Sequence, residues 1–291
     1  MNRKEALKVL SVCATGLGVG VPLTGFSNQK HKSKPTSLKG NINHSACQWC
    51  YDSIPLEQFC EQSKDLGLTG IDLLRPDQWS VAEKYGLTTS MAYPEKSSLT
   101  DGFCNLEEHE WLQKSYLDAI PAASDAGLKN IICFSGNRKG QTDEVGLENS
   151  AKGLDKLVKQ AEKYNITLTM ELLNSKVDHK DYMCDKSEWG VKLCEKLGSP
   201  NFKLLYDIYH MQIMEGDVIA TIRKNNKYYG HYHTGGVPGR HEINDSQELN
   251  YPAIMKAILE TGFKGFVAQE FIPTREDKMA SLKEGVLICD V

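Results

Sequence analysis

Beyond residue 40 the sequence alternates regularly between short apolar runs and longer stretches of helical periodicity. The apolar runs have strand length, and the stretches between them place apolar residues on one helical face. In residues 147–165, for example, Leu154, Leu157 and Ala161 fall on one face, with lysines and acidic residues opposite. The eight runs are 42–47, 67–74, 87–93, 130–136, 166–174, 202–210, 228–236 and 265–272, and further helical stretches are 107–127 and 251–262.

Eight strands that are each followed by a helix predict an α/β fold of the (β/α)8 TIM-barrel type, which usually takes about 250 residues. An open doubly wound sheet is the alternative, but it would usually place a Gly-rich phosphate loop after its first strand. The first run here continues as "CQWCYDS", which is not such a loop. We therefore predict one barrel domain over residues 41–291.

The first forty residues differ from the rest in composition. A basic start, "MNRKEALK", precedes a short apolar run, and together they predict an export leader over 1–26, followed by a polar linker over 27–40. The start resembles a degenerate twin-arginine signal, with Lys4 in the place of the second arginine. We expect an exported, periplasmic protein without stable membrane insertion after processing. The alternative is an uncleaved extension of a cytoplasmic protein.

Charge and cysteine content narrow the possible partners. The net charge is −4 and the pI about 6.1, so no basic field is available to attract nucleic acid. Of nine cysteines, only Cys47 and Cys50 have a suggestive spacing. No second Cys/His pair completes a zinc site, which favours a structural thiol pair or a disulfide.

A barrel of this type places its chemistry at the C-terminal ends of its strands. Runs five to eight end in Glu171, Asp207, His233 and Glu270. Carboxylates with one imidazole suit Mn²⁺, Mg²⁺ or Co²⁺, and Zn²⁺ is possible. Converging carboxylates without a cation would repel one another, so a single divalent metal ion is the simpler account. Taken singly, each residue could instead be a solvated loop residue or a helix cap, and Asp207 in particular could be a cap.

Two further histidines accompany these positions. His231 and His233 alternate along one run and so face the same side, with His233 nearer the rim. His231 is then expected to be a hydrogen-bonded core residue or a neighbour of the metal ligands. His210, three residues after Asp207, is expected to orient a ligand or contact substrate, and a structural hydrogen bond is the alternative.

The segments "YDIYHMQIMEGD", "HYHTGGVPGRHE", "MELLN" and "AQEF" resemble the xylose isomerase-like barrel superfamily, specifically its hydroxypyruvate isomerase-like branch. The resemblance covers about residues 41–285. It implies one divalent metal ion held by Glu171, Asp207, His233 and Glu270, with the two glutamates as the catalytic acid/base couple. It also implies substrate contacts from His210, Arg240 and, through the stretch "DHKDYM", His179. Asn174, at the end of run five, and Arg138, after run four, complete the predicted substrate-binding set.

The reaction implied is an isomerisation by proton transfer through an enediolate between the two glutamates. The substrate would be hydroxypyruvate-like, or a non-phosphorylated sugar or sugar acid, since no phosphate loop is evident. Three alternatives remain: a ketose 3-epimerase, a non-catalytic envelope sugar-binding protein, and an AP endonuclease-like phosphodiesterase. The last would require two extra histidines at the early strand ends, where the sequence has Arg75 and Tyr93. A homo-oligomer is compatible with the sequence.

Overall fold

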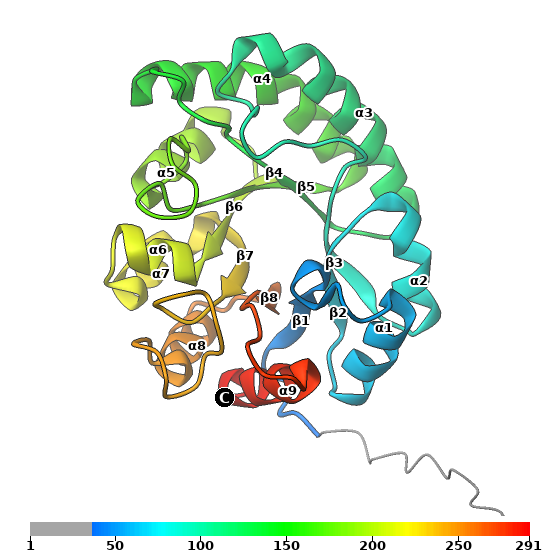
Figure 1. Ribbon diagram of the computed structural model, residues 1–291. Coiled ribbons are helices and arrows are strands. Elements are labelled where there is room, and N and C mark those ends of the chain that lie inside the picture. Colours follow the sequence, from blue (N-terminus) through cyan, green and yellow to red (C-terminus); the bar gives the residue numbers. More distant parts are fainter. Residues whose placement is uncertain (1–36) are drawn as a thin grey trace, which may run out of the picture. The chain divides into compact units, whose positions relative to one another are not determined.

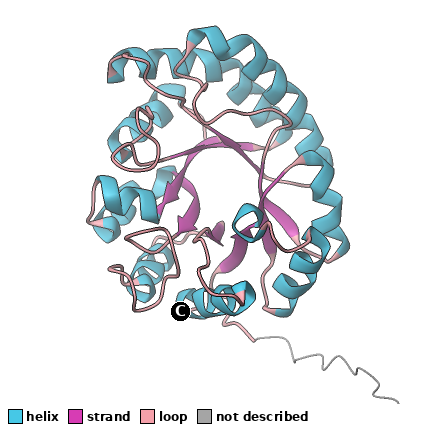
Figure 2. Ribbon diagram, viewed as in Figure 1, coloured by secondary structure: helices cyan, strands magenta, loops and turns pink. Residues whose placement is uncertain are grey.

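The computed structural model describes residues 37–291. The expected leader over 1–26, and most of the linker expected over 27–40, lie outside the described residues. The described part forms a closed barrel of parallel strands in the order β1 to β8, so the predicted TIM-barrel architecture is confirmed. Figure 1 shows the strands as an inner ring, and Figure 2 shows the helices arranged outside it.

Each strand pairs with its sequence neighbours, and β1 closes the barrel against β8. The strands are β1 Asn43–Cys47, β2 Gly70–Leu74, β3 Thr88–Ala92, β4 Asn130–Cys133, β5 Thr167–Glu171, β6 Phe202–Asp207, β7 Tyr229–Thr234 and β8 Phe266–Gln269. The α-helices are α1 Leu56–Asp65, α2 Trp79–Lys84, α3 His109–Asp125, α4 Asp143–Tyr164, α5 Ser187–Leu197, α6 Ile208–Met214, α7 Val218–Asn225, α8 Tyr251–Glu260 and α9 Lys278–Cys289. Short 3₁₀ turns lie at Gln48–Tyr51, Pro76–Gln78, Leu106–Glu108 and Asn226–Tyr228.

The strands end earlier than the apolar runs predicted. The run over 202–210 is strand only to Asp207, because the side chain of Asp207 caps the helix that begins at Ile208. The runs over 130–136 and 166–174 likewise leave the sheet at Cys133 and Glu171. In each case the apolar residues that follow the strand are themselves buried, so hydrophobicity alone could not mark the boundary.

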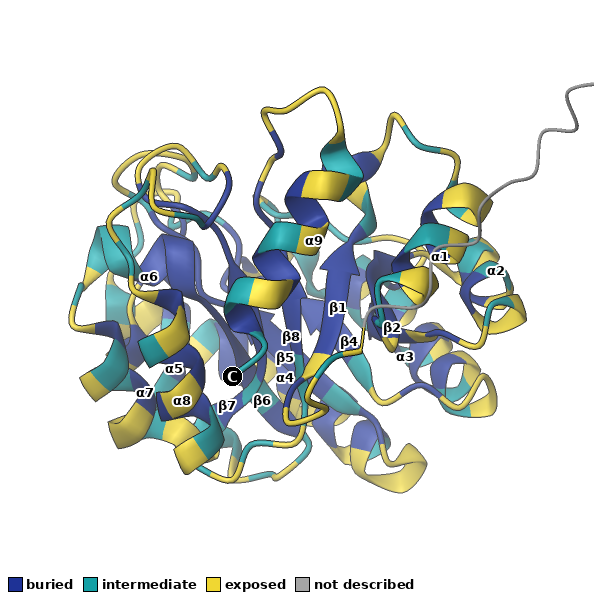
Figure 3. Ribbon diagram, turned by 90° about the horizontal axis from the view of Figure 1, so that it is seen from below, coloured by how far each residue is buried: buried dark blue, intermediate teal, exposed yellow. Residues whose placement is uncertain are grey.

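The core has two parts with different chemistry. Apolar side chains fill the space between strands and helices, and Figure 3 shows the strands as buried while the outer helix faces are exposed. Polar side chains also lie on the strands, including Ser45, Thr169 and His231, each with a buried polar atom that has no hydrogen-bond partner among the described residues. Thr169 lies two residues before Glu171 on β5, and His231 lies two residues before His233 on β7. Residues two apart on a strand face the same side, so Thr169 and His231 lie inside the barrel beneath the strand-end residues.

Cys47 and Cys50 are both buried free thiols in this structure, without a disulfide between them. Within residues 37–291, no helix is both long enough and apolar enough to cross a bilayer.

Candidate metal centre and active site

Four buried side chains meet at the C-terminal ends of consecutive strands: Glu171 on β5, Asp207 on β6, His233 on β7 and Glu270 directly after β8. One potential ligand atom from each lies within 4.8 Å of those of the other three. His233 Nδ1 is 3.2 Å from Glu171 Oε1, 2.9 Å from Glu270 Oε2 and 3.9 Å from Asp207 Oδ2. We call these four residues the quartet. The structure therefore brings together the set expected at the strand ends.

Asp207 serves the backbone and the quartet at once. Its Oδ1 accepts a hydrogen bond of 2.9 Å from the backbone N–H of His210, which caps α6. Its Oδ2 faces the quartet, because it lies 3.9 Å from His233 Nδ1. Asp207 is thus both a helix cap and a member of the quartet, because one carboxylate oxygen binds the backbone and the other lies near His233.

The quartet has the properties of a site for a hard divalent cation. Glu171 Oε1 and Asp207 Oδ2 are buried and accept no hydrogen bond among the described residues. Leaving such anionic oxygens unpaired is costly, and a cation would satisfy both. Three carboxylates with one imidazole are also the donor set that suits such ions. The residues present therefore fit the metal ion that the sequence indicates.

The electrostatics of the carboxylates reflect their crowding. Burial raises the pKa of Glu171, and the nearby Glu270 carboxylate adds to this, while the His233 imidazole, 3.2 Å away, opposes the shift. Burial also raises the pKa of Asp207 well above its usual value. Glu270 is buried too, but the positive charge of Arg240, followed by His233, holds its pKa well below the ordinary range.

A carboxylate from the opposite side of the barrel supports the histidine of the quartet. Asp72 on β2 accepts a hydrogen bond of 2.8 Å from His233 Nε2, and it also binds His231 Nε2 and Ser90 Oγ. Burial would raise the pKa of Asp72, but His231 and the hydrogen bonds from both histidines outweigh it and hold the pKa low. His231 is thus hydrogen-bonded inside the barrel, as expected. Because Asp72 binds Nε2 of His233, Nδ1 of that ring faces the carboxylates of the quartet.

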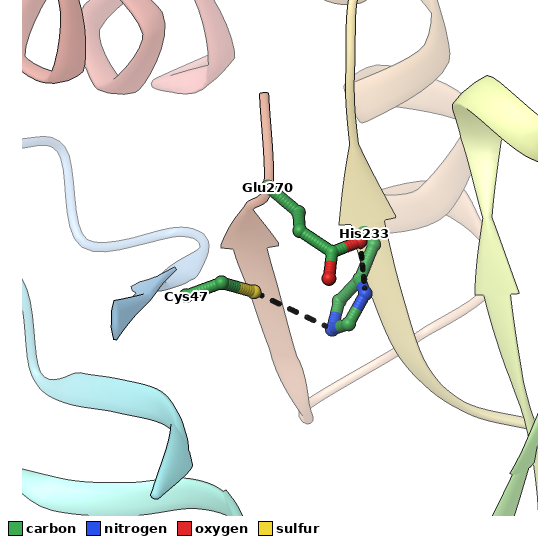
Figure 4. A group of neighbouring side chains, drawn as sticks. All are labelled: Cys47, His233 and Glu270. Carbon is green, nitrogen blue, oxygen red and sulfur yellow. Dashed lines mark hydrogen bonds and ion pairs between the residues drawn. The ribbon is translucent and has the colours of Figure 1, made fainter. Parts of the chain in front are cut away.

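Cys47 approaches the same histidine from β1. Its Sγ is 3.8 Å from His233 Nε2 and 3.6 Å from Asp72 Oδ2. Figure 4 shows the thiol directed at one nitrogen of the imidazole and the Glu270 carboxylate at the other. Burial raises the pKa of Cys47 well above its usual value, so this residue is a neutral thiol packed against the ring.

Arg240 lies over the quartet. Its Nη2 is 2.5 Å from Glu270 Oε2 and 3.7 Å from Asp207 Oδ2. The guanidinium lies over the rings of Trp49 and Tyr209, at 5.2 and 5.5 Å from their centroids. Trp49 in turn donates from Nε1 to Glu270 Oε1 over 2.9 Å. Arg240 is therefore held beside the carboxylates, where the resemblance predicts a substrate-binding arginine.

A second connected group of side chains lies next to Asp207 and consists of His210, Asn174 and His179. Asn174 Nδ2 is 2.6 Å from His210 Nδ1, and the His179 ring packs on that of His210 with centroids 5.1 Å apart. Burial, followed by the charge of Arg240, lowers the pKa of both histidines. His210 Nε2 and His179 Nε2 have no hydrogen-bond partner among the described residues.

Arg138 is the one predicted site residue that the structure does not bring to this group. Its guanidinium pairs with Asp143 and with Asp185 Oδ1 at 3.1 Å. It also donates to the carbonyl of Met183. None of its hydrogen bonds among residues 37–291 reaches the quartet, so it acts in this structure as a brace between the loops after β4 and β5.

Neither Asp72 nor Trp49 is among the site residues predicted from the sequence. Their positions near the ends of the first two apolar runs were the available signal. What the sequence could not show is that Asp72 reaches His233 on β7, or that the indole of Trp49 reaches Glu270.

Comparison with known proteins bears on this geometry. A family model described as "Xylose isomerase-like TIM barrel" matches residues 60–287. A human protein named "Putative hydroxypyruvate isomerase" is 31% identical over 135 residues, which cover 46% of this chain and 47% of the relative. A protein of Cupriavidus necator named "2-oxo-tetronate isomerase" is 34% identical over 108 residues, covering 37% and 41%. The chain thus spans about half the length of these curated relatives.

Among solved structures, one titled "AP endonuclease, family 2" from Brucella melitensis superposes with a TM-score of 0.73. It covers 84% of this chain and 97% of its own, at 20% sequence identity. At that identity the likeness shows a shared fold and nothing about activity.

Proposed function

Because the chain belongs to the xylose isomerase-like TIM barrel family, we propose that it is a metal-dependent isomerase of a small hydroxy-carbonyl substrate. The observation that carries the proposal is the quartet, in which two glutamates share one buried site with an aspartate and a histidine. The names of the two curated relatives, both isomerases, support the same reaction class.

We propose a non-phosphorylated substrate, either a hydroxypyruvate-like keto acid or a sugar or sugar acid. The unpartnered nitrogens beside the quartet are His210 Nε2, His179 Nε2 and Arg240 Nε. Where such a nitrogen carries a proton, it binds hydroxyl, carbonyl or carboxylate oxygens. The name 2-oxo-tetronate isomerase, borne by a relative, is consistent with a small oxo acid.

In the proposed mechanism the quartet binds one divalent cation, which when bound polarises the substrate carbonyl and so acidifies the neighbouring C–H bond. One of Glu171 and Glu270 removes that proton, and the other delivers a proton to the adjacent carbon. Arg240 and His210 hold the substrate oxygens beside the glutamates. The buried position of both glutamates keeps bulk water away from the proton being moved.

The proposal is tested by deuterium exchange from D₂O into a panel of hydroxypyruvate, hexuloses and uronates, with Mn²⁺ added. We expect one substrate class to incorporate deuterium at the carbon next to its carbonyl. The variants Glu171→Gln and Glu270→Gln should lose at least about 10²-fold in exchange rate. Glu148→Gln, an exposed residue that pairs with Lys196, is the matched control and should exchange at the wild-type rate.

Full-rate exchange in both glutamine variants would refute the mechanism, and no exchange with any substrate would favour a binding protein instead. Product analysis separates the isomerase from a ketose 3-epimerase, because the latter returns the proton to the same carbon. Titration with Mn²⁺ should saturate at one equivalent. Tight binding of three equivalents would favour the phosphodiesterase.

We also propose that the protein is exported, on the basis of the leader-like composition of residues 1–26 alone. Fusing these residues to a reporter that is active only in the periplasm tests this. A reporter that stays inactive would favour the cytoplasmic alternative.

A further inference from the structure

The side-chain amide of Asn174 can adopt only one orientation. Its Oδ1 accepts hydrogen bonds from the backbone N–H groups of Val177 and Asp178, over 3.0 and 2.9 Å. Turning the amide around would place its NH₂ group against these two donors. The turn that follows β5 therefore fixes which end of the amide is the oxygen, and Nδ2 must point the other way.

The fixed amide determines the tautomer of His210. Asn174 Nδ2 donates to Asp178 Oδ2 over 2.7 Å and lies 2.6 Å from His210 Nδ1. Because Nδ2 can only donate, His210 Nδ1 must accept and carries no proton. Within residues 37–291, Nδ1 makes no other hydrogen bond, and its one ion-pair distance, to Asp178 Oδ2 at 3.9 Å, is too long for one. The proton of the neutral ring is therefore on Nε2.

That N–H group is aimed at the quartet and has no partner. His210 is fully buried, and its Nε2 makes no hydrogen bond among the described residues. Nε2 lies 3.9 Å from Asp207 Oδ2, an oxygen that is itself unpartnered. A buried donor in this position requires an acceptor, and an oxygen atom placed beside Asp207 would supply one.

We propose that Asn174 is a positioning residue that holds His210 as the Nε2–H tautomer, a neutral donor to the substrate oxygen bound beside Asp207. This inference rests on the proposed function for the identity of the acceptor. It departs from the expectation that Asn174 itself binds substrate, since both ends of its amide are already used inside the protein.

The tautomer has a chemical consequence. A neutral imidazole N–H stabilises negative charge that develops on an oxygen without giving up its proton, as an oxyanion-hole donor does. His210 would then stabilise the reacting oxygen, while proton transfer at carbon stays with Glu171 and Glu270. The turn after β5 thus links a backbone conformation to the chemistry of a side chain on α6.

The tautomer is measured directly by long-range ¹H–¹⁵N correlation spectra of the full chain loaded with Mg²⁺, with the His210 signals assigned by their loss in His210→Gln. We expect the proton on Nε2 in the wild type. In Asn174→Ala the constraint is lost and the Nδ1–H form should appear. Asp178→Asn, which alters the same turn but leaves the Asn174–His210 contact, is the matched control and should keep the wild-type pattern.

Kinetics of two His210 variants test whether the Nε2–H group of His210 stabilises the substrate oxygen during the reaction. The amide nitrogen of glutamine can stand in for Nε2, whereas that of asparagine stands nearer to Nδ1. We expect His210→Gln to retain kcat within about tenfold and His210→Asn to lose roughly 10²–10³-fold, the usual cost of one such donor. The Mn²⁺ affinity of both variants should be unchanged.

The outcomes are separable from those of the proposed function. A wild-type proton on Nδ1, or an Asn174→Ala spectrum identical to the wild type, would overturn the positioning role even for an active isomerase. Equal loss of kcat in His210→Gln and His210→Asn would overturn the donor role. The spectra need no substrate, so a failure to find turnover would refute the proposed function and leave the tautomer to be judged on its own.

Discussion

At the scale of single residues, Asp72 links the quartet to the opposite side of the barrel. Its carboxylate accepts hydrogen bonds from His233 and His231, both on β7, and from Ser90 on β3. With His233 Nε2 held by Asp72, the other ring nitrogen is presented to the quartet. Partners of this kind orient a ligating histidine and typically contribute 10–100-fold to metal affinity.

We therefore predict that Asp72→Asn weakens Mn²⁺ binding by roughly 10–100-fold, measured by isothermal titration calorimetry. The carboxylate of Asp72 can only accept a hydrogen bond, so it keeps a proton on Nε2 of His233. The side-chain amide of asparagine can also donate, so in the variant that nitrogen need not carry the proton. Ser90→Ala is the matched control, since it removes one donor to Asp72 but keeps the carboxylate, and its affinity should stay within a few-fold of the wild type. Wild-type affinity in Asp72→Asn would contradict the prediction.

Sequence position was enough to indicate the quartet because parallel strands deliver their end residues to one edge, whatever the loops do. Sequence position did not predict the contacts of Arg138 correctly, although this residue also follows a strand. Two acidic residues, Asp143 at the start of α4 and Asp185 in the loop after β5, bind its guanidinium. Nor could it show the role of Asn174, which depends on a turn that only the three-dimensional structure reveals.

At the scale of elements, the loop between β7 and α8 carries Arg240 and is fixed to the loop after β8 by one carboxylate. Glu242 accepts hydrogen bonds from the N–H and hydroxyl of Thr274 and from the hydroxyl of Ser281, at 2.8, 2.9 and 2.8 Å. Burial alone would raise the pKa of Glu242, but these bonds and those of the backbone lower it to about 2. The position of Arg240 is thus tied to α9.

We predict that Glu242→Gln lowers the free energy of unfolding at pH 7 by about 1–3 kcal/mol, since hydrogen bonds to a charged acceptor are replaced. The folded-state pKa of Glu242 is depressed, so its contribution is fully present above about pH 4.5 and is lost as the pH falls toward 2. The difference between variant and wild type in urea unfolding should shrink over that interval. A difference that is constant with pH would show that the carboxylate charge does not contribute.

The strands were predictable in number and order, but the ends of the elements were not, and the connection from β6 to β7 contains two helices, α6 and α7, where one was expected. The expected helix over 147–165 begins at Asp143 instead, where Thr142 supplies the cap from its hydroxyl. The polar first turn of that helix carries no apolar stripe, so periodicity could not detect it. The same limit applies at Asp207, whose capping hydrogen bond ends β6 three residues before the apolar run does.

At the scale of the whole molecule, acid stability depends on a histidine in the core. His44 on β1 is 1% exposed, and neither ring nitrogen has a hydrogen-bond partner among the described residues. Burial lowers its pKa from 6.5 to about 4, although Asp290, whose Oδ1 is 3.9 Å away, opposes the shift. The folded state therefore disfavours the protonated ring.

The sign of the effect follows from proton binding. Between about pH 6.5 and 4 the unfolded chain binds a proton at His44 that the folded protein does not, so stability falls as the pH falls through this range. A shift of this size corresponds to about 3 kcal/mol. We predict that the Tm of His44→Gln falls less than the Tm of the wild type when the pH is lowered from 7 to 4, as measured by differential scanning calorimetry. His241→Gln, at an exposed position, should follow the wild type. Parallel Tm curves for His44→Gln and wild type would contradict the prediction.

The fold as a whole was the most predictable property, because eight repetitions of one pattern average out local errors. Misplaced strand ends, such as those after Cys133 and Glu171, did not change the strand count or the order of pairing. The polar barrel interior was less predictable. Ser45 and Thr169 read as ordinary strand residues, and only barrel closure shows that they lie below the site rather than toward solvent.

The indole of Trp49 offers a practical means of observing this centre. It is 39% exposed, it donates to Glu270, and the guanidinium of Arg240 lies against its ring. The hydrogen bonds of the other tryptophan side chains go elsewhere: Trp79 and Trp189 to backbone carbonyls, and Trp111 to Glu108. Any ion or molecule that engages Glu270 must alter the surroundings of one tryptophan and leave three largely unchanged. The chain thus carries its own fluorophore at the mouth of the barrel, through which occupancy can be followed in real time without a label.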